Sequence, residues 1–109
     1  ISFDASDVLS LDGSIIPLDF TLSQNYPNPF NPSTKIKYSI PSTEFVSIVI
    51  YDLMGRSIKS FVNIEQNAGY YELHWNATNN EGYPVPAGMY FYIIKAGTFK
   101  STKKMLLLK

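Results

Sequence analysis

The chain has 109 residues, a formal net charge of zero, 45% hydrophobic residues, one histidine and no cysteine. This length suits one domain with a sizeable core, and the lack of cysteine excludes disulfides and thiolate metal sites. Zero net charge gives no support for a nucleic-acid partner, and no apolar run reaches the roughly 18 to 20 residues of a transmembrane segment. We therefore expect one domain that needs no cofactor.

Residues 1–19 alternate only weakly between apolar and polar positions, and the turn dipeptide Asp12-Gly13 divides them. Their only charged residues are four acids: Asp4, Asp7, Asp12 and Asp19. The segment is an extra hairpin, a linker or the end of a preceding domain, and we expect part of it to pack on the main body. Because the chain starts at Ile1 and shows no signal peptide, we expect a piece of a longer or processed protein.

Residues 24–32 have the sequence Gln-Asn-Tyr-Pro-Asn-Pro-Phe-Asn-Pro. Each proline fixes φ near −65° and lacks a backbone donor, and each preceding residue is pushed toward extended conformations. The segment is therefore neither a helix nor a central strand, and we predict a stiff connector between two strands. We expect this connector to pin the side chains of Tyr26 and Phe30 into the core.

Short alternating segments separated by turn signals continue to the last residue. They predict seven strands at residues 20–23, 35–40, 45–52, 57–64, 70–75, 89–96 and 98–109. No segment has a sustained period near 3.6, so we expect no helix longer than one turn. The predicted fold class is all-β, a seven-stranded antiparallel sandwich.

Three of these strands allow their buried faces to be predicted. We expect the inward set to be Ile36, Tyr38, Ile40, Val46, Ile48, Ile50, Tyr71, Leu73 and Trp75. Glu72 and His74 fall on the opposite face, because burying them without partners is costly. Residues 52–55 suit a type I turn with glycine last. The strand at 89–96 is apolar on both faces, which indicates a covered central strand or an exposed docking patch.

Catalysis is not expected. His74 is the only good general base near neutral pH, and the acids are scattered without the spacing of a glycosidase pair. The loop from Asn76 offers several oxygen ligands but a single carboxylate, Glu81, which is fewer than calcium sites use. The triplet Asn76-Ala77-Thr78 fits a glycosylation acceptor pattern that is common by chance. We predict a protein that is not an enzyme and binds no metal.

Charge is unevenly distributed near the end of the chain. After Glu81 there is no acid and there are five lysines: Lys95, Lys100, Lys103, Lys104 and Lys109. One interpretation is a solvated edge strand, because lysine opposes edge-to-edge pairing of sheets. The other is a basic tail that is offered to a partner.

Taken in order, these motifs resemble the C-terminal sorting domain of type IX secretion substrates, over about residue 20 to the last residue. The resemblance rests on the proline motif, the Tyr-Asp and Gly-Arg turn, the step at residues 86–90 and the lysine-rich end. Its structural positions are Asn25, Tyr26, Pro27, Asn28, Pro29, Phe30, Asp52, Gly55, Arg56 and Trp75.

The resemblance implies an immunoglobulin-like sandwich at residues 20–109 that is a recognised substrate without catalytic activity. Such domains follow a passenger that is exported to the periplasm, and they address it to the outer-membrane type IX machinery. A sortase-like peptidase then removes the domain, and the passenger reaches the cell surface or the medium. The implied recognition residues are Pro86, Gly88, Tyr90, Lys103, Lys104 and Lys109.

The chain departs from the family pattern at Met89, where the family often has valine, and at Ile93, where a polar residue is common. Ile93 makes that face more apolar. Recognition is expected to proceed by strand addition at the last strand, with lysines supplying the electrostatic component. Two alternatives stay open. One is a carbohydrate-binding module that uses Tyr70, Tyr83, Phe91 and Tyr92 as a stacking platform. The other is a structural immunoglobulin-like domain resembling that of the flagellar hook-capping protein.

Overall fold

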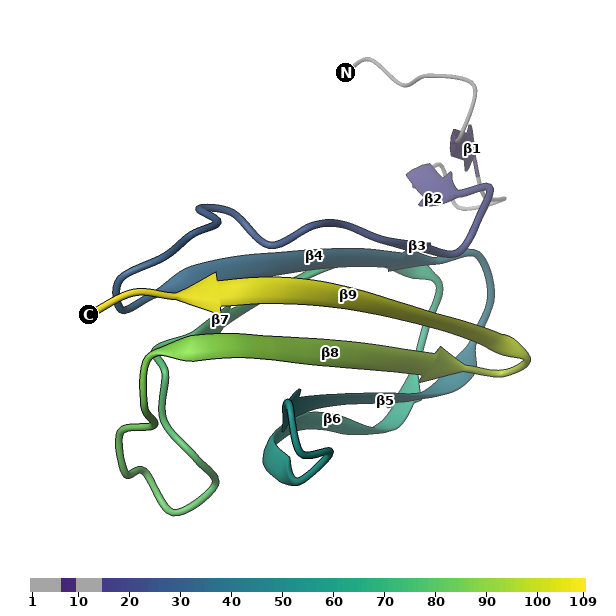
Figure 1. Ribbon diagram of the computed structural model, residues 1–109. Helices are drawn as coiled ribbons and strands as arrows, with labels where there is room; N and C mark the ends of the chain where they lie inside the picture. The colour runs from purple at the N-terminus through teal and green to yellow at the C-terminus, as the bar shows by residue number, and fades with distance from the viewer. Residues whose placement is uncertain (1–6, 10–14) are drawn as a thin grey trace.

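The computed structural model describes residues 7–9 and 15–109, which form strands joined by turns and loops (Figure 1). The strands are β1 Asp7–Leu9, β2 Ile15–Pro17, β3 Thr21–Leu22, β4 Thr34–Ile40, β5 Glu44–Asp52, β6 Ser57–Gln66, β7 Gly69–Trp75, β8 Gly88–Ala96 and β9 Phe99–Leu107. In the described part of the chain, nothing forms a helix long and apolar enough to cross a membrane.

Seven of these strands form two antiparallel sheets that face each other (Figure 1). One sheet has the order β3-β4-β7 and the other has the order β6-β5-β8-β9. Immunoglobulin-like domains distribute their strands between two such sheets and join them by crossovers. The predicted all-β, seven-stranded immunoglobulin-like sandwich is therefore confirmed.

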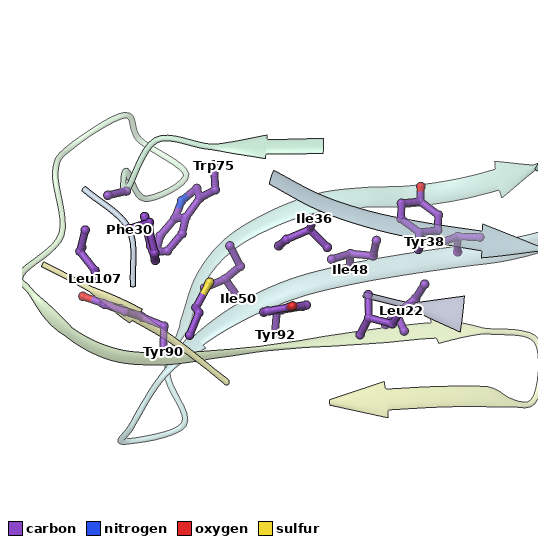
Figure 2. Close-up of a cluster of buried hydrophobic side chains, with 14 of the residues drawn as sticks. Leu22, Phe30, Ile36, Tyr38, Ile48, Ile50, Trp75, Tyr90, Tyr92 and Leu107 are labelled. Carbon is purple, nitrogen blue, oxygen red and sulfur yellow. The ribbon is translucent and has the colours of Figure 1, made fainter. Parts of the chain in front are cut away.

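The core lies between the two sheets, and strand alternation decides which side chains enter it (Figure 2). The inward faces predicted for the strands at Ile36, Val46 and Trp75 are confirmed, because alternate residues of each strand are the buried or partly buried ones. Glu72 and His74 lie on the exposed face of β7, as expected.

Aromatic side chains dominate one end of the core, where Phe30, Trp75 and Tyr90 meet (Figure 2). The Trp75 ring centroid lies 5.7 Å from that of Phe30 and 5.4 Å from that of Tyr90, which approaches it edge-on. The Trp75 indole donates a hydrogen bond of 2.8 Å to the Thr78 carbonyl, so its single polar atom is satisfied although the ring is buried.

Residues before β3 add a small hairpin, in which β1 pairs antiparallel with β2. β2 approaches β7, and the Ser39 hydroxyl donates a 3.0 Å hydrogen bond to the Asp19 carbonyl. The described part of the segment therefore contacts the three-stranded sheet. The turn expected at Asp12-Gly13 lies outside the described residues.

Strand ends differ from the prediction where the chain turns or changes its partner. β9 ends at Leu107 instead of continuing to Lys109. The reason is that β8 begins at Gly88, which pairs with Leu107, so no residue of β8 is left to pair with Leu108. The Leu108 amide donates instead to the Phe30 carbonyl, 2.9 Å away. β6 extends to Gln66 and pairs with β5 through two register shifts, which explains its irregular sequence pattern.

Candidate functional site

The proline segment, residues 24–32, is organised around a buried asparagine. Asn25 is 2% exposed, and its amide group donates to the Thr34 hydroxyl at 2.9 Å and to the Pro27 carbonyl at 3.2 Å. The Thr34 hydroxyl in turn donates to the same carbonyl at 2.8 Å. Because each of these buried groups has a partner, the network fixes the path of the segment at little cost.

Of the two aromatic side chains of the proline segment, one is buried and the other is exposed. Phe30 is 2% exposed and was predicted correctly, whereas Tyr26 is 80% exposed and the prediction that it enters the core is wrong. The backbone of Tyr26 bonds to that of Lys35 through its N–H at 3.0 Å and its carbonyl at 2.9 Å. With Asn25 pointing inward, alternation turns the next side chain toward solvent.

The proline segment also covers part of the free edge of β9. The Phe30 amide donates to the Leu106 carbonyl at 3.0 Å, and the Leu106 amide donates to the Asn28 side-chain oxygen at 3.0 Å. The Gln24 side chain adds a hydrogen bond to the Lys104 carbonyl. The predicted open edge of the last strand is therefore wrong for residues 104–108, where these groups already have partners.

The first half of β9 has no comparable cover. Every second residue of β9 points its backbone N–H and C=O away from β8, toward the free edge of the sheet. Lys100 and Thr102 are in this outward row together with Leu106. Within residues 7–9 and 15–109, no segment forms hydrogen bonds to this part of the row. A strand could therefore add to β9 only at its first half without displacing the proline segment.

Tyr90 acts inside the core and not on the surface. It is 5% exposed, and its hydroxyl donates to the Pro86 carbonyl at 2.5 Å. Burial, and then the nearby charge of Asp52, raise the pKa of the Tyr90 hydroxyl, which keeps this donor protonated. The bond fixes the exposed Pro86, and Gly88 starts β8 with φ of +145°, which favours glycine.

Asp52 holds the turn between β5 and β6. Its carboxylate accepts the amides of Met54 and Arg56, each at 2.9 Å, and the Arg56 Nε at 2.8 Å. The hydrogen bond from the Arg56 amide is the main reason that the pKa of Asp52 is lowered. Gly55, with φ of +82°, donates to the Asp52 carbonyl at 3.0 Å, so the predicted turn is present.

This turn and the start of β8 border a shared pocket of about 290 Å³. Two motifs that are separate in sequence are therefore neighbours in space. The lining residues are Asp52, Leu53, Met54, Arg56, Ile58, Pro86, Ala87, Gly88, Met89 and Tyr90. No sequence pattern predicted the contribution of Leu53 and Met54, which are 70% and 81% exposed at the tip of the turn.

The predicted recognition lysines do not form one cluster. Lys103 is opposite Tyr92 on the core side of the sheet, whereas Lys104 is opposite Phe91 on the outer side. Lys109 lies beyond the end of β9 and is exposed. Lys104 instead shares the outer side with Lys95 and Lys100, which face each other across β8 and β9.

The outer face of the three-stranded sheet carries paired charges. Glu72 lies 3.0 Å from the His74 ring nitrogen and 3.8 Å from the Lys37 ammonium. All three side chains are exposed, so this is a solvated surface with balanced charge. In the described part of the chain, no group of three or more His, Asp or Glu side chains could hold a metal ion.

The aromatics proposed for a sugar-stacking platform do not share a face. Tyr92 is fully buried, and its hydroxyl donates to the Ser23 carbonyl at 2.7 Å. Tyr70 lies on the outer side of β7, Phe91 on the outer side of β8, and Tyr83 in the loop between those strands. The structure does not bring these four side chains together.

Comparison with known proteins gives one family and several similar folds. The family described as the secretion system C-terminal sorting domain matches residues 24–108. No curated protein has significant sequence similarity to the chain. The latent dimeric PorU of Porphyromonas gingivalis is similar with a TM-score of 0.62 and 21% identity, over 83% of this chain and 9% of PorU.

Two further structures resemble the chain in fold. One is PorZ, a surface component of the type IX secretion system of P. gingivalis, with a TM-score of 0.56 and 20% identity over 83% of this chain and 11% of PorZ. The other is FlgD from P. aeruginosa, with a TM-score of 0.52 and 17% identity over 72% of this chain and 67% of FlgD. The chain thus spans about a tenth of PorU and PorZ.

Proposed function

We infer the function of this chain from its family, because the match over residues 24–108 shows that it belongs to the secretion system C-terminal sorting domains. It is a sorting signal for type IX secretion, and the resemblance predicted from its motifs is confirmed. This single observation favours sorting over the carbohydrate-binding and structural alternatives. Proteins that carry such a domain are exported to the cell surface or beyond.

We propose that residues 20–109 form the sorting domain, and that residues 1–19 are a linker or the end of a preceding domain. A passenger on the N-terminal side enters the periplasm first, and the outer-membrane machinery then recognises the folded sandwich. A sortase-like peptidase removes the domain after translocation. The domain itself is a substrate in these steps and performs no catalysis.

The recognised surface is proposed to combine Pro86 and Gly88 with the lysines at the end of the chain. Support comes from the exposed position of Pro86, from the exposure of Lys104 and Lys109, and from the uncovered first half of β9. Tyr90 contributes indirectly, because its buried hydroxyl holds the Pro86 carbonyl. Strand addition at β9 is the mode of binding that an open edge permits.

The test fuses the full 109-residue chain behind a reporter with a secretory signal, in a host with a working type IX system. We expect the reporter at the surface or in the medium, and in the periplasm when the host lacks that system. Retention in the periplasm of the competent host would refute the sorting role. A glycan array with the purified chain separates the alternative, because a sorting domain should retain no polysaccharide.

The lysine contribution is tested in the same host with the triple variant Lys103→Ala, Lys104→Ala, Lys109→Ala. We expect export to fall, because the variant removes positive charge at the proposed recognition end. Unchanged export would exclude the electrostatic part of the proposal while leaving the sorting role intact.

A further inference from the structure

The outer face of the four-stranded sheet differs from an ordinary solvated surface. Outward side chains of three adjacent strands form an apolar patch whose members are all partly exposed. The patch consists of Val49, Tyr51, Met89, Phe91, Ile93 and Leu106. Its centre is ordered, since the Tyr51 and Phe91 rings stack with centroids 5.6 Å apart.

Three lysines border this patch on the side of β8 and β9. Lys95 and Lys100 are directly opposite each other, and Lys104 is opposite Phe91. Among the described residues none of the three forms an ion pair. Like charges directly opposite in a ladder are destabilising, so the pair of Lys95 and Lys100 is unfavourable within the domain alone.

Protection of the sheet edge does not explain this pair. Lysine on an edge strand opposes unwanted strand pairing, which accounts for Lys100 and Lys104 on β9. Lys95 lies on β8, which has β5 on one side and β9 on the other. Its ammonium group therefore adds positive charge to the face without protecting an edge.

We propose that this lysine-rimmed face docks a protein of the sorting route whose own surface is apolar at its centre and acidic at its rim. The inference rests on the proposed function and assigns a second contact surface to it. Charge complementarity selects the partner, because a second copy of this chain would bring lysines against lysines. A bilayer is disfavoured as well, since every member of the apolar patch is only partly exposed and so offers little surface for insertion.

The size of the face fits a temporary contact. The three strands that carry the patch and its lysines are about 4.8 Å apart and about 30 Å long, which gives a face of roughly 400 Å². Stable complexes bury about 800 Å² on each partner, and smaller interfaces are typical of transient encounters. A cargo that is recognised and then released needs such a transient interface.

Charge reversal gives the first test, with a matched control on the other sheet. Lys95→Glu with Lys100→Glu changes two exposed lysines on the lysine-rimmed face, and Lys35→Glu with Lys37→Glu changes two exposed lysines on the outer face of β4. We expect reporter export to fall at least about tenfold in the first double variant and to stay within about twofold in the second. Equal export from both variants would overturn the proposal.

Photocrosslinking identifies the occupant. p-Benzoylphenylalanine replaces Ile93 on the lysine-rimmed face or Tyr70 on the outer face of β7, in the full chain fused to the reporter. We expect a protein adduct from position 93 alone, and only in the host with the type IX system. An adduct with lipid, an adduct with a second copy of the chain, or equal protein adducts from both positions would each refute the proposal.

The export measurements separate a failure of the sorting role from a failure of the docking face. If the unmodified fusion is not exported, the sorting role is wrong. If it is exported and the variant with Lys95→Glu and Lys100→Glu is exported equally well, the docking face alone is wrong. Circular dichroism and thermal unfolding of each purified variant show whether a loss of export has a folding cause.

Discussion

The two edges of the four-stranded sheet are covered in different ways. At the β6 edge, the backbone amide of Asn80 donates a hydrogen bond to the Ile58 carbonyl at 3.1 Å, and the Asn80 side-chain oxygen accepts one from the Ser60 amide at 3.0 Å. At the β9 edge, the cover is the proline segment, which belongs to the other end of the sequence and has buried anchors. The β6 edge is thus capped by an exposed residue, whereas the cover of the β9 edge is anchored in the core.

This difference explains why the sequence of the proline segment is so specific. The cap at the β6 edge uses only the backbone amide and the side chain of one exposed residue, Asn80. A cover that also fills the core must place Asn25 inward, Tyr26 outward and Phe30 inward, with fixed backbone angles between them. The motif is therefore explained by packing and hydrogen bonding at the β9 edge.

The largest expected effect concerns the anchor of the β9 cover. Phe30→Ala removes a buried ring that contacts Trp75, and we expect it to lower the free energy of unfolding by about 3–5 kcal/mol. Tyr26→Ala, in the same segment, changes an exposed ring and should cost less than about 0.5 kcal/mol. Urea denaturation measures both, and similar losses would contradict the assignment of inward and outward positions.

The polar anchor should matter next. Asn25→Ala removes the amide that donates to the buried Thr34 hydroxyl and to the Pro27 carbonyl, at an expected cost of about 1–3 kcal/mol. The matched control is Asn31→Ala, at an exposed position of the same segment. Equal unfolding midpoints for the two variants would show that the buried network does not stabilise the domain.

The two edges can be compared directly with Asn28→Ala and Asn80→Ala. Each removes a side-chain hydrogen bond to a strand edge, and we expect each to cost about 0.5–1.5 kcal/mol. Hydrogen exchange should locate the effects separately, with faster exchange at the Leu106 amide in the first variant and at the Ser60 amide in the second. Faster exchange at both amides in either variant would mean that the edges are not independent.

The smallest expected effect is on the pH dependence of stability, through the turn that precedes β6. The pKa of Asp52 is lower in the folded state than in the unfolded chain, where it is near 3.9. The ionised carboxylate therefore stabilises the fold fully above the unfolded pKa, and this stabilisation is lost as the pH falls through the folded pKa. We expect Asp52→Asn to lower the melting temperature at pH 7 and to have a smaller effect at pH 2. A difference from the unchanged chain that is the same at both pH values would rule out this charge-dependent stabilisation.

Most of the fold could be predicted because it depends on local periodicity. Strict alternation around Ile36, Val46 and Tyr71 defines both the strands and their inner faces. The turn at Asp52 is likewise encoded within a few residues, since its carboxylate bonds to the next residues of the chain. Such features need no knowledge of distant parts of the sequence.

The contacts around the proline segment could not be predicted in this way. The hydrogen bonds from Gln24 to Lys104 and from Leu106 to Asn28 join residues 80 and 78 positions apart. No periodic pattern relates such residues. The burial of Asn25 instead of Tyr26 was missed for a related reason, because hydrophobicity alone favours the aromatic ring and only the partners of the asparagine reverse that order.

The packing of β9 also bears on how the domain is made. Met105 and Leu107 are buried, and Leu106 holds the proline segment that leads into β4. A chain that stops before Phe99 lacks these groups, so β8 becomes an uncovered edge and Phe30 loses its backbone partners. During synthesis, the sandwich can close only after its last strand has emerged from the ribosome. The buried core is therefore complete only when the residues of β9 are present.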